Sequence, residues 1–448
     1  MLAWLIQMIT DPRWSLGRRL IFGMMIGIVV GFAAVGFRLA SGALSGFLLY
    51  IEKEGIAAAP PLLLFMVPAL GGLAVGLLTR LFFGRNAGIP GVPDVVLAQT
   101  RDRGFMSWLT ALKTVVLNIL ALGTGASVGR EVPLVHLGAT LGSLGGSWLQ
   151  VDDANRRIYV ACGVAAGVAA SFNAPLAGLF FAIEITLVGL ISLSLVALGP
   201  VVLAAIAGTL VSRTLLDGDK AFEITKTLEL SVWEFPAFLL LGLVCALVSI
   251  SFLRLVKLGW ALRRRVLGGL PSWLHPAFAG VALGLMALIM PEILGVGYQA
   301  TFKTLNGDYP STYLLGLFFV KMVAVLFCLV LGFGSGVFSP SLMMGAIIGV
   351  LFGQVATQIV LHLPSHIISH SADIIAYGYA GMGAMVGAVL GAPLSTILMI
   401  FELTGDYEVT LAVMLTVIVA SQLTHAVIGN TIFGLQLEGR GVRMVLGG

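Results

Sequence analysis

The chain is poor in charged residues and in cysteine. Only 10% of its 448 residues are charged, whereas a soluble domain carries about 25%. Its three cysteines all lie in apolar runs and indicate no disulfide framework. The sequence also lacks HExxH and the phosphate loop GxxxxGK[ST], which argues against a zinc hydrolase and an ATP-driven pump. What it has instead is a mean hydropathy of +1.04, typical of a multi-pass membrane protein.

Apolar runs cover most of the chain, and a membrane span needs about 20 such residues. Eight runs are long enough to span: 20–48, 61–83, 195–213, 236–253, 276–298, 311–331, 341–361 and 408–429. Three further apolar blocks are interrupted by Gly and Pro: 106–150, 158–194 and 374–403. We therefore expect an all-α, polytopic membrane domain over residues 1–448, with several broken helices and no soluble domain of useful size.

The net charge of +4 reflects arginines at the ends of the apolar runs. Arg13, Arg18 and Arg19 precede the first long run, which predicts a cytoplasmic N-terminus because cytoplasmic loops carry the excess of Lys and Arg. The triplet 263–265 is a further candidate for the inner face. A basic balance of this kind does not imply a nucleic-acid partner.

One motif occurs twice, at a constant offset of 207 residues. It reads GASVGREVPLVHLGATLGS from Gly125 and GFGSGVFSPSLMMGAIIGV from Gly332. Pro133 and Pro340 suit the first turn of a helix, so each copy predicts a helix N-terminus whose free backbone N–H groups attract anions. Unwound backbone survives in a membrane only where it lines a cavity or is buried in protein. Two such helices meeting with their N-termini inward would form an ion site.

A second internal sequence repeat supports a duplicated architecture. Residues 163–184 match 381–402 at an offset of 218, each with an APL segment and a final glutamate. Two pairs in the same order predict two homologous halves, joined by a polar linker, and their small-residue faces permit close helix packing. The expected boundaries are 20–215 for the first half, 216–235 for the linker and 230–435 for the second half.

Four ordered motifs make the chain resemble the CLC family of chloride channels and chloride–proton antiporters: NAGIP (86–90), GREVP (129–133), GSGVFSP (334–340) and the paired APL segments. The resemblance implies two inverted halves, a homodimer with one pore per subunit and transport of chloride or a similar anion, either passively or coupled to protons. It implies neither an enzyme nor a cofactor. The chain resembles the short prokaryotic members without CBS domains, which predicts a multi-pass protein of a bacterial inner membrane, in contact with lipid.

Glu131 is the candidate gate. A carboxylate inside a membrane segment is costly unless it has a function, and Glu131 lies at the mouth of a predicted helix N-terminus. The N–H groups that bind an anion would also stabilise its ionised form, so Glu131 can compete with chloride, and protonation would release it. Its position matches the gating glutamate of the family. The alternative from the residues alone is a buried ion pair with Arg130.

The predicted anion path combines backbone groups of three signatures with one C-terminal position. Backbone N–H donors suit a halide because they bind it without a fixed counter-charge that would trap it. The residues expected along the path are Ala87, Gly88, Ile89, Pro90, Gly129, Arg130, Gly336, Val337, Phe338 and Phe433.

Three positions depart from the family pattern. Ala87 replaces a serine and Phe433 a tyrosine, so a preference for nitrate or fluoride over chloride is an alternative. Ile185 stands where antiporters often carry an inner, proton-transferring glutamate. That change favours a passive channel, or an antiporter that takes protons by another route. Glu184 could relay protons, but its repeat partner Glu402 favours a structural role such as helix capping.

Other interpretations have less support. An unrelated transporter of organic anions would need a roomier site than these bulky side chains allow. An intramembrane enzyme using Glu131 and His136 would need a nucleophile or metal set, and none is convincing. His362, His366 and His370 have helical spacing, but Pro364 and the absence of nearby carboxylates indicate a loop, so we predict no metal site.

Overall fold

The computed structural model describes residues 15–49, 60–84, 88–187, 195–216, 232–360 and 373–442. Every regular element within these ranges is helical. The longer helices are α2 (Ser15–Leu49), α3 (Pro61–Phe83), α5 (Trp108–Gly123), α6 (Glu131–Trp148), α7 (Asp153–Phe172), α9 (Leu195–Leu215), α10 (Phe235–Val266), α11 (His275–Ala287), α13 (Ser311–Leu331), α14 (Phe338–Val360), α15 (Ile374–Leu390), α16 (Pro393–Thr404) and α17 (Tyr407–Ile428). Shorter ones are α4 (Val92–Thr100), α8 (Pro175–Phe181), α12 (Tyr298–Leu305) and α18 (Ile432–Gly439).

Seven helices among the described residues are long and apolar enough to cross a membrane. They match seven of the eight long runs predicted from the sequence, which confirms an all-helical, multi-pass membrane protein. The eighth prediction, a continuous span over 276–298, is wrong. Helix α11 ends at Ala287, and the chain turns through Pro291, Gly295 and Gly297 before α12 begins at Tyr298. Both glycines have positive φ, so the chain cannot continue as a helix there.

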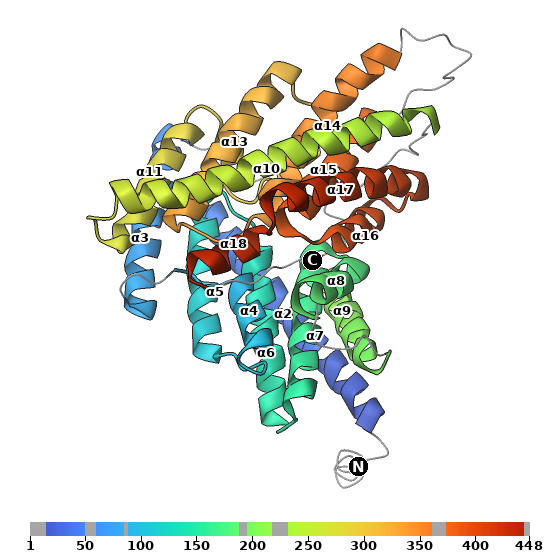
Figure 1. The fold of residues 1–448 in the computed structure, drawn as a ribbon. Coiled ribbons are helices and arrows are strands. Elements are labelled where there is room, and N and C mark those ends of the chain that lie inside the picture. The colour runs from blue at the N-terminus through green and yellow to red at the C-terminus, as the bar shows by residue number, and fades with distance from the viewer. Residues whose placement is uncertain are drawn as a thin grey trace.

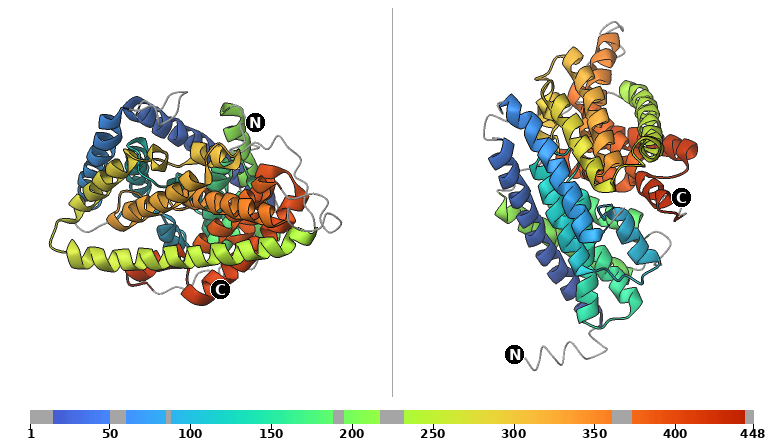
Figure 2. Two further views of the ribbon diagram at one scale, coloured as in Figure 1. Left: turned by 90° about the horizontal axis from the view of Figure 1, so that it is seen from above. Right: turned by 90° about the vertical axis from the view of Figure 1, so that its left-hand side faces the viewer.

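The two halves of the chain form two lobes. Figures 1 and 2 show the blue-to-green helices up to α9 in one lobe and most of the yellow-to-red helices from α10 onward in the other. Helices α3 and α11 pack together across the two lobes.

Matched helix contacts show that the halves repeat each other. Helix α6 packs on α7 in the first half, and α14 packs on α15 in the second. A Cβ at Gly138 would lie 2.1 Å from the carbonyl oxygen of Gly163, and one at Gly345 would lie 2.3 Å from that of Gly381. These are equivalent positions of the two sequence repeats, so both halves use the same glycine pair to bring two helices into backbone contact. The boundaries of 20–215 and 230–435 stay a prediction.

Candidate functional site

The two Gly-rich motifs meet in the structure, as their sequence predicts. The Gly129 N–H donates to the Gly336 carbonyl oxygen at 2.9 Å. A Cβ at Gly336 would lie only 2.1 Å from the Gly129 oxygen, so only glycine fits there. Helix α6 starts two residues after Gly129, and α14 starts two residues after Gly336. The contact therefore brings together two helix N-termini, where first-turn N–H groups lack intrahelical partners.

Glu131 lies between these N-termini. The residue is 2% exposed, and its Oε1 accepts hydrogen bonds from the hydroxyls of Ser339 and Tyr298, the latter at 3.1 Å. No described residue bonds to Oε2. A Cβ placed on Gly129 would lie 2.2 Å from Oε2 and 3.2 Å from the backbone nitrogen of Ser339. The carboxylate is therefore held against the first turn of α14, where an anion would also be stabilised.

Arg130 does not form an ion pair with Glu131 among the described residues. Its Nη2 donates to the Ser171 carbonyl oxygen at 3.1 Å. Its guanidinium carbon lies 4.6 Å from the centre of the Tyr298 ring, within the range of a cation–π contact. The buried ion pair considered from the sequence is thus absent from this arrangement, and Glu131 is held by hydroxyl groups.

A buried lysine fixes the loop that carries Tyr298. Lys321 on α13 is fully buried and donates to the carbonyl oxygens of Ile293 at 2.9 Å and Gly295 at 3.1 Å. The Gly295 N–H in turn donates to the Gly125 carbonyl oxygen at 3.1 Å. This loop is thereby tied to the first Gly-rich motif, which sets the position of Tyr298 beside Glu131. Lys321 thus bonds to backbone carbonyl groups inside the protein.

Sequence reasoning missed Tyr298 and Ser339. Ser339 stands inside the second signature, at the second residue of α14, so its place in GSGVFSP was an available signal. Tyr298 follows GVG after Pro291, a break that the apolar run concealed.

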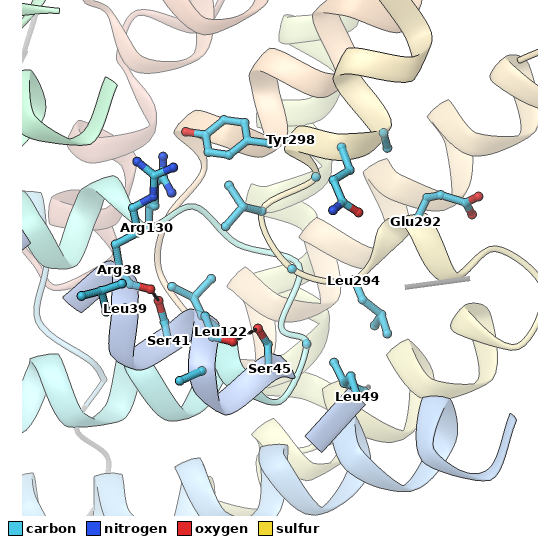
Figure 3. Close-up of a pocket in the computed structure, with 18 of the residues that line it drawn as sticks. Arg38, Leu39, Ser41, Ser45, Leu49, Leu122, Arg130, Glu292, Leu294 and Tyr298 are labelled. Carbon is cyan, nitrogen blue, oxygen red and sulfur yellow. Dashed lines mark hydrogen bonds between the residues drawn. The ribbon is translucent and has the colours of Figure 1, made fainter. Parts of the chain in front are cut away.

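A pocket of about 570 Å³ opens beside Tyr298. We call it the outer pocket, because it is lined by the half of α2 remote from the predicted cytoplasmic N-terminus. Figure 3 shows Arg38 and Arg130 at one end of it and Glu292 at the other. Among the described residues, three cations line the pocket, these two arginines and Lys303, together with one carboxylate. This excess of positive charge favours anions.

The first signature also converges on this site. Ala87 lies outside the described residues, Gly88 is exposed, and Ile89 and Pro90 are buried. A Cβ on Gly91, the residue that follows them, would lie 2.9 Å from Val132 Cγ1 and 3.8 Å from Ser335 Oγ. Segments from three signatures therefore come within van der Waals reach of one another.

Three bulky path residues predicted from the sequence are buried. Val337 is 1% and Phe338 2% exposed, and the Phe338 ring lies 4.6 Å from that of Phe172 between centres. Phe433 is 1% exposed on α18, a helix that packs on α4. Their role in anion binding stays a prediction.

Glu184 and Glu402 each cap the N-terminus of a helix in the opposite half of the chain. Glu184 accepts from the N–H groups of Leu394 and Ser395, both at 2.8 Å. Glu402 accepts from those of Leu176 and Ala177, at 2.8 and 2.9 Å. In each half, the N–H donors belong to the turn that follows the Ala-Pro of the APL segment. Each carboxylate thus uses both oxygens on the N-terminus of the equivalent helix, α16 or α8. This reciprocal capping is the structural role considered for the pair.

Ile185 follows Glu184 in a turn of π-helix, η3 (Ala182–Leu187). Its side chain is 5% exposed. π-Helical turns are frequent at functional sites, but an isoleucine carries no proton.

The remaining candidates lie apart from these contacts. His136 is 2% exposed on α6, and its Nδ1 has no partner among the described residues. The three histidines at 362, 366 and 370 fall outside the described residues. Within those that are described, no group of three His, Cys, Asp or Glu side chains could hold a metal ion.

Comparison with known proteins gives the family. The model of the family described as "Voltage gated chloride channel" matches residues 71–425. The chain belongs to this family. A Citrobacter koseri relative, "Voltage-gated ClC-type chloride channel ClcB", is 29% identical over 93% of this chain and 98% of its own length. The Arabidopsis thaliana "Chloride channel protein CLC-f" is 30% identical over 90% of this chain, which spans 53% of that protein.

Solved structures of this family have the same fold. A slow cyanobacterial Cl−/H+ antiporter superposes with a TM-score of 0.83 at 25% identity, over 94% of this chain and 98% of its own. A CLC-type fluoride/proton antiporter gives a TM-score of 0.76 at 21% identity, over 95% of this chain and 99% of its own. The resemblance read from the four motifs is confirmed, and the chain is a CLC-family anion transport protein with the CLC fold.

Proposed function

We propose that this CLC-family chain transports chloride through a path that Glu131 opens and closes. The observation that carries the proposal is the position of Glu131. It lies between two helix N-termini and is hydrogen-bonded to Tyr298, which lines the cationic outer pocket. When ionised, the carboxylate takes the place at the α14 N-terminus that an anion would take. When protonated, it loses most of its attraction to that N-terminus, and an anion replaces it.

We further propose that protons reach Glu131 from the outer pocket. Tyr298 both lines that pocket and bonds to Glu131. Both oxygens of Glu184 are occupied by backbone N–H groups, and Ile185 has no ionisable group. This arrangement favours a proton-gated chloride channel.

Proton-coupled exchange is the second candidate. It is favoured by the similarity to the cyanobacterial Cl−/H+ antiporter. Selectivity for another anion is a variant of either mechanism, supported by Phe433 at the position of the pore tyrosine. A homodimer and a bacterial inner-membrane location stay predictions on the family pattern.

Chloride efflux from liposomes containing the purified chain, with external pH recorded at the same time, tests the proposal. Fast efflux that rises as pH falls, without proton movement in fixed ratio, supports the gated channel. Proton uptake in fixed ratio to chloride, driven against its gradient, would establish the antiporter instead. Absence of chloride flux in the presence of nitrate or fluoride flux would refute chloride as the substrate.

A further inference from the structure

A second pocket, of about 450 Å³, lies where four spanning or apolar helices end or begin. It is lined by the last turns of α3 and α10, the end of α13 and the start of α11. Figure 1 shows the end of α10 lying close to α11 and α3. Among the described residues that line it, four are basic and none is Asp or Glu; the basic ones are Arg80, Arg263, Arg264 and His275. We call it the arginine pocket.

Three of the four basic residues already contact other groups of the chain. Arg263 Nη1 donates to the Val330 carbonyl oxygen at 2.8 Å, and His275 Nε2 lies 3.2 Å from the Leu267 carbonyl oxygen. Arg80 has its guanidinium carbon 6.0 Å from the centre of the Trp273 ring. Neither Arg80 nor Arg264 pairs with a carboxylate of the described chain. The pocket therefore keeps an uncompensated positive charge.

Two polar atoms of lining residues lack hydrogen-bond partners. Thr79 Oγ1 and Trp273 Nε1 are both buried and have none among the described residues. Buried polar groups are nearly always paired, so each such atom needs an explanation. Both can donate a hydrogen bond. Both atoms are closed to solvent in this structure, so a ligand oxygen reaches them only after their side chains rotate. With the arginines, such donors match the oxygens of a phosphate group, which accept charge-assisted hydrogen bonds.

The pocket is at the ends of three helices that are long and apolar enough to cross a membrane, α3, α10 and α13. The ends of such helices reach the lipid headgroups, and the arginines there indicate the inner face by the same rule that predicts a cytoplasmic N-terminus. Large apolar side chains beside it are exposed, namely Leu81 at 75% and Val266 at 66%. Basic pockets between spanning helices at this depth bind anionic headgroups, while the acyl chains lie along apolar helix surfaces.

We propose that the arginine pocket binds the phosphate of an anionic phospholipid headgroup. The presence of Arg80 and Arg263 at these helix ends could be explained by capping alone, because cations are favourable at helix C-termini. Capping does not explain why the Thr79 and Trp273 donors lack partners, or why a cavity lies between these helix ends. The proposal is independent of the gate at Glu131, since none of its contacts involves that residue.

The test measures binding of short-chain phosphatidylglycerol to the full chain, purified in a neutral detergent, by native mass spectrometry. Short-chain phosphatidylcholine and inorganic phosphate are the comparison ligands. Arg264→Gln removes one donor from the pocket, and the matched control, Arg265→Gln, removes the neighbouring exposed charge that does not line it. We expect Arg264→Gln to weaken phosphatidylglycerol binding about tenfold and Arg265→Gln to leave it unchanged.

Three results would overturn the proposal. Equal weakening by both substitutions would show only general surface charge. Inorganic phosphate that displaces the lipid at similar concentration would make this a site for free phosphate. Unchanged lipid binding together with altered chloride flux in neutral liposomes would make the pocket part of the anion path, whose signature residues Gly88 and Ile89 also line it. If Arg264→Gln does not fold, Arg80→Gln tests the same donor set.

Discussion

The Tyr298 hydroxyl lies 3.1 Å from Glu131 Oε1, although 167 residues separate the two positions in the sequence. The same tyrosine lines the outer pocket and packs its ring against Arg130. Tyr298 is thus the described side chain that connects the solvent-facing cavity with the candidate gate. Its hydroxyl donates to the carboxylate and helps to hold it at the α14 N-terminus.

Tyr298→Phe removes this hydrogen bond and keeps the ring over Arg130. A hydrogen bond to a charged group contributes roughly 1.5–3 kcal/mol, and about 1.4 kcal/mol corresponds to a factor of ten in an equilibrium constant. The substitution removes one of the hydroxyl groups that hold the carboxylate at the α14 N-terminus, so an anion displaces Glu131 more readily. We expect chloride efflux from liposomes at a fixed pH to rise about tenfold over the wild-type rate.

Tyr309→Phe is the matched control. Tyr309 lines the same pocket, but its hydroxyl is not among the groups bonded to Glu131. Its removal should leave the rate of chloride efflux unchanged. An equal rise in both variants would mean that the pocket's general polarity, and not the Tyr298 hydrogen bond, controls the gate.

Glu131→Gln mimics the protonated gate permanently. The amide carries no charge to compete with an anion at the α14 N-terminus, so chloride flux should persist and become independent of pH. Any proton movement coupled to chloride should disappear. A variant that kept the wild-type pH dependence would show that another group is the gate.

Glu184→Gln and Glu402→Gln form a natural pair, because the two carboxylates make equivalent contacts in the two halves. An amide can accept with one oxygen only and turns its NH2 toward a second N–H donor, at a cost of about 1–3 kcal/mol. Both substitutions should lower the thermal unfolding midpoint by a similar amount and leave pH dependence unchanged. Loss of proton coupling in Glu184→Gln alone would identify Glu184 as a relay.

Local sequence signals predicted the elements of the site better than their assembly. The glycines and prolines of 125–142 and 332–349 fix where two helices start, so the pairing of their N-termini could be predicted from the motifs. The position of Tyr298 beside Glu131 could not be predicted, because it depends on a loop that Lys321, far along the chain from Glu131, holds in place. Within the apolar run 276–298, hydropathy alone did not show that Pro291 and two glycines interrupt the helix.

Gly336→Ala tests whether the contact between the two motifs is essential. The added Cβ would lie 2.1 Å from the Gly129 carbonyl oxygen, so the backbones must separate and the Gly129–Gly336 hydrogen bond must break. Since this contact sets the two N-termini around Glu131, chloride efflux should fall at least about tenfold, as expected when site geometry shifts by an ångström. Gly36→Ala in α2 is the control, because its Cβ would meet no atom within 4 Å; it should keep full efflux. Wild-type efflux in Gly336→Ala would show that the close approach of the two motifs is not required for transport.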